Sequence, residues 1–194
     1  MANWAYTDYV IEGPVETIQK IEKAIKEHPV QEKSSEDWEG NVIIALNGNI
    51  NWKPAENHYM RGFINMESVL LDEDSSVLKF GAEEAWGITD FDSELKGIFP
   101  DIKVYWRTEE PDEEIYSTND SEGKYFKDRF YVDTCINGNY ESEYFTYESD
   151  VYKWLYKITN GKVNTKKKVE KFNEGVDLSE GDDYIRILEF TVVK

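Results

Sequence analysis

The residues best suited to chemistry in this chain are carboxylates, and their densest run is Glu109-Glu110-Pro111-Asp112-Glu113-Glu114. Like charges in a row repel one another and Pro111 favours a turn, so we expect this run at an exposed strand end or hairpin tip. The run could be a solvated tip with no ligand, or it could bind a cation or a basic peptide. The residues predicted to form an acidic binding patch are Glu109, Glu110, Asp112, Glu113 and Glu114.

Two other uses of carboxylates are weaker. Asp90-Phe91-Asp92-Ser93-Glu94 begins like a calcium-binding loop, but Leu95 stands where that loop needs glycine, so we interpret it as the acidic first turn of a helix. Acid-base catalysis needs two carboxyl groups whose pKa values differ, and sequence does not show which of the chain's 40 acidic residues would meet that condition. No catalytic residue is therefore predicted.

Other catalytic and metal-binding signatures are absent from the sequence. His28 and His58 are the only histidines and have no metal-ligand spacing, and Cys135 falls in a strand-like run where a packed thiol is expected. No phosphate-binding loop, dinucleotide fingerprint or serine nucleophile motif occurs. We predict neither a cofactor nor a metal site.

The charge balance limits the class of partner. The chain of 194 residues has a formal net charge of −18, which argues against direct binding to nucleic acid and to anionic membranes and permits a basic protein surface. The one basic cluster contains Lys166, Lys167 and Lys168; we interpret it as a loop or short strand that screens acidic groups or contacts a partner. No apolar run approaches the roughly 20 residues of a membrane span. With its single cysteine and no signal-like start, the chain is predicted to be cytoplasmic.

Apolar spacing predicts the order of elements in the first part of the chain. Strand-like alternation and helical spacing follow one another, separated by turn residues such as Gly13-Pro14 and Asn47-Gly48. A helix that begins at Val15 is expected to end at His28-Pro29, and Thr89 is expected to cap a second helix. The predicted strands are residues 4–12, 42–46, 59–71, 77–86 and 102–107, and the second helix ends at Phe99-Pro100.

The remaining sequence predicts a hairpin, a helix and a last strand. Asn137-Gly138 between two strand-like runs is a strong hairpin signal, and Gly161 is expected to end a helix over residues 151–160. Residues 183–193 form the predicted last strand. We therefore predict an α+β fold: a ferredoxin-like βαββαβ antiparallel sheet with helices on one face and an extra C-terminal hairpin, helix and strand. The predicted domain organisation is a single domain, 1–194, with its core in 1–118 and an elaboration in 119–194.

One segment also resembles a known family. Trp86-Gly87-Ile88-Thr89-Asp90-Phe91, then Phe99-Pro100, Val104-Tyr105-Trp106 and Glu109-Glu110 resemble the Api-like proteins of phages and mobile elements, which have a ferredoxin-like domain. The start Met1-Ala2-Asn3-Trp4 is similar to that group as well, and the resemblance covers about the first two-thirds of the chain. It implies a fold and a mobile-element setting, and it carries no activity or catalytic residues.

Two functional hypotheses follow. The first is a non-enzymatic, acidic protein-interaction module of mobile-element or phage origin, whose sharper form imitates nucleic acid and occupies a DNA-binding protein. The second is a carboxylate-dependent hydrolase that acts on an uncharged substrate such as a glycan.

Overall fold

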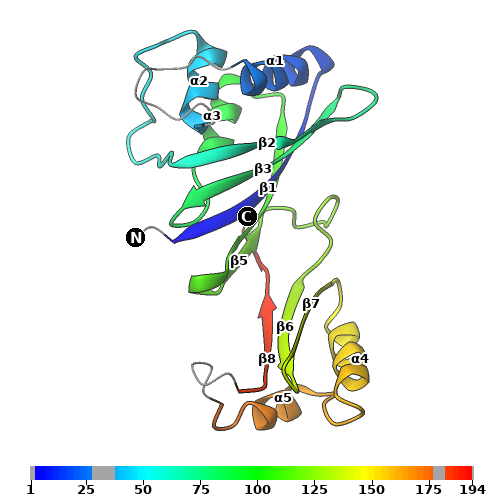
Figure 1. The fold of residues 1–194 in the computed structure, drawn as a ribbon. Coiled ribbons are helices and arrows are strands. Elements are labelled where there is room, and N and C mark those ends of the chain that lie inside the picture. Colours follow the sequence, from blue (N-terminus) through cyan, green and yellow to red (C-terminus); the bar gives the residue numbers. More distant parts are fainter. Residues whose placement is uncertain (1–2, 28–37, 177–181, 194) are drawn as a thin grey trace. The chain divides into compact units, whose positions relative to one another are not determined.

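The computed structural model describes residues 3–27, 38–176 and 182–193, and these form two compact units. Unit 1 comprises residues 1–121 with 193–194, and unit 2 comprises residues 122–192; each contains its own hydrophobic core (Figure 1). The predicted α+β class with mostly antiparallel sheets is confirmed. Where the sequence predicts one domain with a division after residue 118, the chain divides after residue 121.

The sheet of unit 1 contains strands from the whole first part of the chain. Within unit 1 its order is β2-β3-β1-β4-β5, and these pairings are antiparallel. In β1, Ala5, Thr7 and Tyr9 point into the core, and Tyr6 and Asp8 between them are exposed. The strands are β1 (Trp4–Glu12), β2 (Gly62–Leu71), β3 (Val77–Ala85), β4 (Lys103–Glu110) and β5 (Ile115–Thr118); β9 (Thr191–Val192) falls within the residues of unit 2.

Three helices lie on one side of this sheet (Figure 1). They are α1 (Val15–Lys26), α2 (Glu39–Asn47) and α3 (Phe91–Ile98), and a short 3-10 helix, η1 (Pro111–Glu113), follows β4. The spacing of Ile18, Ile21 and Ile25 buries one face of α1 in the core, as predicted. The predicted end of α1 at His28-Pro29 lies outside the described residues.

Residues 42–46 were predicted as a strand, and this prediction is wrong because they belong to α2. Val42, Ile43 and Ile44 are all buried, so the segment shows neither strand-like nor helical alternation, and a short apolar run does not distinguish the two. Gly48 ends the helix with a left-handed backbone (φ 72°), and its N–H donates to Ile44 O over 2.9 Å.

Unit 2 is built on a three-stranded antiparallel sheet of order β7-β6-β8. Its elements are β6 (Phe130–Ile136), β7 (Asn139–Phe145), α4 (Glu148–Ile158), α5 (Lys166–Phe172) and β8 (Tyr184–Glu189). The predicted hairpin is confirmed, with Asn137 and Gly138 both at positive φ. The basic cluster with Lys166, Lys167 and Lys168 was predicted as a loop or short strand, but these residues begin helix α5. Among the described residues, no helix has the length and apolar character needed to cross a membrane.

Candidate functional site

In the predicted acidic patch, Glu109 and Glu110 lie on opposite faces of the sheet, and the side chain of Asp112 lies outside the described residues. Successive side chains of a strand point to opposite faces, so β4 places Glu109 and Glu110 on different sides of the sheet. Glu110 is buried, and Glu109 is half-buried with an oxygen 3.4 Å from Arg107 Nε. Glu113 and Glu114 are exposed, and Glu113 Oε1 accepts a 2.5 Å hydrogen bond from Asn3 Nδ2. A binding role for this run stays a prediction.

The most unusual chemistry lies inside unit 1, where two glutamates are fully buried. Glu39 is the first residue of α2 and Glu84 lies near the end of β3, and each has 0% exposure. The Thr89 hydroxyl lies 2.7 Å from Glu39 Oε2 and 3.0 Å from Glu84 Oε1. One hydroxyl can form a hydrogen bond with each of two carboxyl groups when one of them is protonated, because it then donates to one group and accepts from the other.

Hydroxyl groups from β1 surround Glu84. Tyr9 donates to Glu84 Oε1 over 2.6 Å, and the Thr7 hydroxyl donates to Glu84 Oε2. The hydroxyl oxygens of Thr7 and Thr108 lie 2.8 Å apart, which links the cluster to β4. Both oxygens of Glu84 therefore accept hydrogen bonds from hydroxyl groups inside the core.

The same surroundings keep Glu39 protonated. Burial, followed by the charge of Glu84, raises the pKa of Glu39 well above its usual value, and the hydrogen bond from Thr89 opposes this only in part. Burial and Glu84 also raise the pKa of the Tyr9 phenol. The protonated form of Glu39 is therefore favoured, because an unpaired buried charge is strongly unfavourable.

Carboxyl groups in different protonation states are what acid-base catalysis requires. Here, however, neither carboxyl group is exposed, so no substrate atom can touch either of them in this structure. Their contacts join α2, β3, β1 and Thr89, two residues before α3, and the pair therefore acts as an internal brace.

Gly62, at the start of β2, gives a direct test of this brace. A Cβ there would lie 2.5 Å from the carboxyl carbon of Glu39, so Gly62→Ala must displace that carboxyl group. We expect a loss of about 2–4 kcal/mol in the free energy of unfolding, measured by urea denaturation. Gly97→Ala in α3 is the control, because its Cβ meets nothing within 4 Å and alanine favours a helix. Equal stability of the two variants would contradict the close packing at Glu39.

An exposed tryptophan lies at the end of β3, close in sequence to this brace. Trp86 is 57% exposed and has a left-handed backbone (φ 60°), which is rare for a bulky residue. The Arg61 guanidinium lies over its ring at 4.7 Å from the centroid, and the Tyr59 ring centroid is 6.3 Å away. Backbone strain of this kind often marks functional positions.

Hydrogen bonds fix the backbone around this tryptophan. Trp86 N–H donates to Asn3 O over 2.8 Å, and Ala85 N–H donates to Arg61 O over 2.9 Å. Tyr59 N–H donates to Asp90 Oδ2 over 2.6 Å, and Asp90 N–H donates back to Tyr59 O over 2.8 Å. The segments before β2 and after β3 are thus held together.

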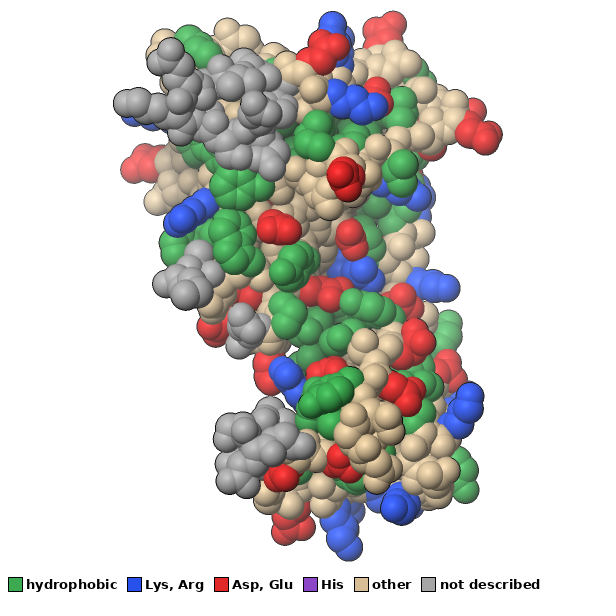
Figure 2. Space-filling model, viewed as in Figure 1, with side chains coloured by type: hydrophobic (Ala, Val, Ile, Leu, Met, Phe, Trp, Pro, Cys, Tyr) green, Lys and Arg blue, Asp and Glu red, His purple; other side chains and the backbone are tan. Residues whose placement is uncertain are grey.

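More aromatic and acidic side chains lie at the same end of the sheet. Trp4 and Phe63 are in contact (5.9 Å between centroids), and exposed Tyr6 pairs across the sheet with Glu83 on one side and Glu109 on the other. On the face drawn in Figure 2, acidic side chains stand singly among hydrophobic and basic ones. We call the residues at this end of the unit 1 sheet the aromatic-acidic end: Trp4, Tyr6, Tyr59, Arg61, Phe63, Glu83, Trp86 and Glu109.

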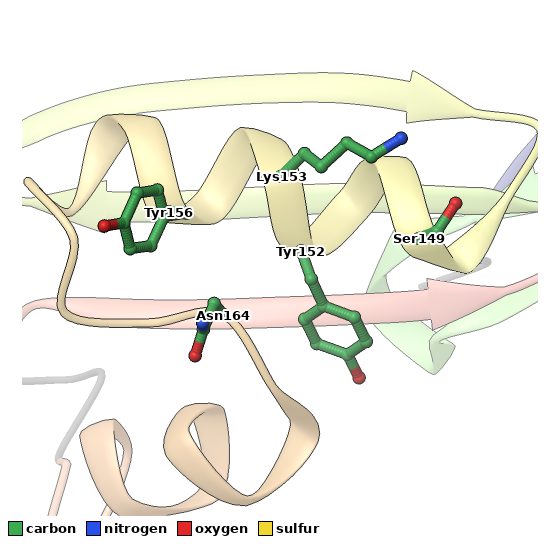
Figure 3. Close-up of a pocket in the computed structure, with 5 residues that line it drawn as sticks. All are labelled: Ser149, Tyr152, Lys153, Tyr156 and Asn164. Atoms are coloured by element: carbon green, nitrogen blue, oxygen red, sulfur yellow. The ribbon is translucent and has the colours of Figure 1, made fainter.

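Unit 2 has a pocket of about 460 Å³ beside α4 (Figure 3). It is lined by Ser149, Tyr152, Lys153, Tyr156 and Asn164. Tyr152 extends from α4 on the side of Asn164, and Lys153 is paired with Asp150 at 2.6 Å. The lining includes exposed Ser149, Lys153 and Asn164 and gives no buried charge to a ligand, so this pocket is a weaker candidate than the aromatic-acidic end.

Comparison of the chain with family models, with curated proteins and with solved structures gave no match. The site therefore has to be judged on its own geometry. Sequence reasoning missed Glu39 and Glu84, although a signal for Glu84 exists: it continues the buried alternation of Leu78, Phe80 and Ala82 in β3. A carboxylate in such a position indicates a buried polar cluster. Thr89, predicted as a helix cap, accepts a hydrogen bond from Phe91 N–H over 3.4 Å and also directs its hydroxyl into that cluster.

Proposed function

We propose that this protein is a non-enzymatic interaction module and that the aromatic-acidic end of unit 1 is its binding surface. The observation that carries the proposal is Trp86, a large exposed aromatic whose position is fixed by Arg61 and by the backbone bond to Asn3. Tryptophan, tyrosine and arginine are the residues that most often dominate the energy of protein interfaces. A rigid anchor also loses little conformational entropy on binding.

The charge around this surface favours a basic protein as the partner. Glu83 is exposed beside Tyr6, Glu109 lies on the other side of Tyr6, and most of the chain's net negative charge falls within unit 1. Complementary charge speeds association and selects partners. In the sharper form of the proposal, the partner's basic surface is one that otherwise binds nucleic acid.

The fold proposed for unit 1 is a ferredoxin-like core with additions. The order β2-β3-β1-β4, antiparallel pairing and helices on one side are what a βαββαβ unit produces, with α2 and β5 as additions. This supports the resemblance to the Api-like group and, with it, a mobile-element origin. Cytoplasmic location is part of the same proposal and is supported by one cysteine, Cys135, which is free and buried.

The hydrolase alternative has less support. The carboxyl groups with the environment for acid-base work, Glu39 and Glu84, are beyond the reach of a substrate. Binding alone explains an exposed aromatic surface, without a catalytic reaction.

The proposal is tested by capture of partners from host-cell lysate on the immobilised full chain, over a series of salt concentrations and with added DNA. We expect a basic protein that is retained at low salt, eluted at high salt and displaced by DNA, since screening and competition both act on its basic surface. Retention that neither salt nor DNA affects would contradict the nucleic-acid mimic. Recovery of no partner would contradict the module itself.

A further inference from the structure

A long connection joins α2 to β2, and part of it is attached to the start of α3. Residues 48–61 form this connection. Glu94 Oε1 accepts a 3.1 Å hydrogen bond from Ala55 N–H, and the same oxygen lies 2.6 Å from His58 Nδ1. His58 N–H in turn donates to Ala55 O over 2.9 Å. One carboxylate oxygen of α3 therefore holds two residues of the connection.

The next residue of the connection is attached to the residue that precedes α3. Tyr59 N–H donates to Asp90 Oδ2 over 2.6 Å, and Asp90 N–H donates back to Tyr59 O over 2.8 Å. The centroids of the Tyr59 and Trp86 rings are 6.3 Å apart. The contact of His58 with Glu94 is therefore next to the backbone bonds that position one ring of the aromatic-acidic end.

The charged groups that act on His58 are all carboxylates. They are Glu94 and Asp92 of α3 and Asp90 just before it, and Asp92 is itself paired with Lys96 at 2.9 Å. The hydrogen bond with Glu94 is the largest influence, and together with these charges it raises the pKa of His58 despite partial burial. The His58 side chain is 33% exposed, so it can exchange a proton with solvent.

The contact between His58 and Glu94 changes in strength with pH. Protonated His58 forms an ion pair with Glu94, whereas the neutral imidazole keeps at most a neutral donor. Because folding raises the pKa of His58, its contribution is fully present below the ordinary histidine pKa and is lost as pH rises through the raised one. The attachment is therefore strongest in mildly acidic solution and weaker in alkaline solution.

We propose that His58 and Glu94 form a pH-dependent clasp, which holds residues 55–59 on α3 and opens more often when His58 loses its proton. The clasp itself is independent of the proposed function, because it consists of contacts within unit 1. Its consequence for binding rests on that function: alkaline pH loosens the segment that carries Tyr59 and so reduces the order of the aromatic-acidic end.

The experiment measures hydrogen exchange at the Ala55 and Tyr59 amides of the full chain between pH 6 and pH 9, as protection factors corrected for the intrinsic rate. We expect protection to fall about two- to fivefold with rising pH, the effect of losing one partly exposed ion pair. Glu94→Gln keeps an oxygen acceptor without the charge, so its protection should not follow the titration of His58. Both proteins contain Glu39, whose raised pKa also weakens unit 1 at high pH, so their difference isolates the clasp.

The titration of His58 gives a second measurement. The chain has two histidines, so His28→Asn leaves one imidazole signal to follow by NMR. In this background the pKa of His58 should lie above the ordinary histidine value, and adding Glu94→Gln should lower it. Glu56→Gln is the matched control, because it removes an exposed charge from the same connection and Glu56 is not among the groups that act on His58. It should change neither the pKa nor the protection.

The outcomes separate the clasp from the proposed function. An ordinary pKa for His58, or the same pH dependence of protection in the wild type and Glu94→Gln, would overturn the clasp. An equal effect of Glu56→Gln would also overturn it, because the overall charge of the connection would then be responsible. Neither measurement involves a partner, so these results leave the binding surface in place, and failure to recover a partner from lysate leaves the clasp in place.

Discussion

Glu39→Gln should raise the free energy of unfolding at pH 8 by about 1–3 kcal/mol and flatten its dependence on pH. In the folded chain Glu39 carries a proton because its pKa is raised by burial and by Glu84. The unfolded chain releases that proton near the ordinary glutamate pKa. The contribution of Glu39 is therefore fully present below that ordinary value, and it is lost as pH rises towards the raised pKa. Glutamine keeps the shape and hydrogen bonds of the protonated form without this loss.

The measurement is urea denaturation of both proteins between pH 5 and pH 9. Their stabilities should be similar at pH 5 and should diverge as pH rises, with the wild type becoming the less stable. Subtracting the two curves removes opposing groups such as Asp72, whose pKa is lowered by hydrogen bonds from Val77 and Ser76. Parallel curves would show that Glu39 does not hold the proton.

Two controls locate the effect. Glu84→Gln should destabilise, because both Glu84 oxygens accept from the Tyr9, Thr7 and Thr89 hydroxyls and glutamine replaces one of these acceptors by an NH₂ donor. Glu83→Gln, one residue away and exposed, should change stability by no more than about 0.5 kcal/mol. Similar behaviour of all three variants would contradict the distinct roles assigned to Glu39 and Glu84.

Trp86→Gly should reduce binding to the basic partner by about 10- to 100-fold while leaving the fold intact. The Trp86 indole is the proposed anchor of the surface, so its removal leaves only the carboxylates to bind the partner. Glycine tolerates the left-handed backbone at this position, and a gain of about 1–2 kcal/mol there offsets the lost contacts with Arg61 and Tyr59. Stability should therefore change by no more than about 1 kcal/mol, as measured by urea denaturation.

The matched control is Tyr140→Ala, which removes an even more exposed aromatic from unit 2. It should leave binding unchanged. A comparable loss of affinity in both variants would mean that general surface aromaticity, and not the aromatic-acidic end, is responsible. A large loss of stability in Trp86→Gly would mean that Trp86 serves mainly the fold.

Local patterns predicted much of the fold. Alternation located β1, β3 and β4, helical spacing located α1, α3 and α4, and Asn137-Gly138 marked the hairpin of unit 2. These succeeded because each element has one buried and one exposed face. The pattern failed at α2, where consecutive residues are all buried and alternation is lost.

The candidate site was harder to predict because it depends on contacts between distant residues. Glu39 and Glu84 are far apart in sequence, and a run of polar and acidic residues gives no sign that one member is buried. Trp86 is exposed and has a left-handed backbone after β3, which the alternation that predicts a strand over residues 77–86 does not indicate. The composition of the run from Glu109 to Glu114 predicted an exposed acidic patch, yet strand alternation buries Glu110.

The binding surface is tested most directly by the indole N–H resonances of the six tryptophans while the basic partner recovered from lysate is added to ¹⁵N-labelled protein. Trp86 and Trp4 belong to the aromatic-acidic end, Trp106 is in the core of unit 1, and Trp154 packs in unit 2. We expect large shifts for Trp86, smaller ones for Trp4, and none for Trp106 and Trp154. A shift of Trp154 with Trp86 unmoved would place binding in unit 2 and contradict a binding surface at the aromatic-acidic end.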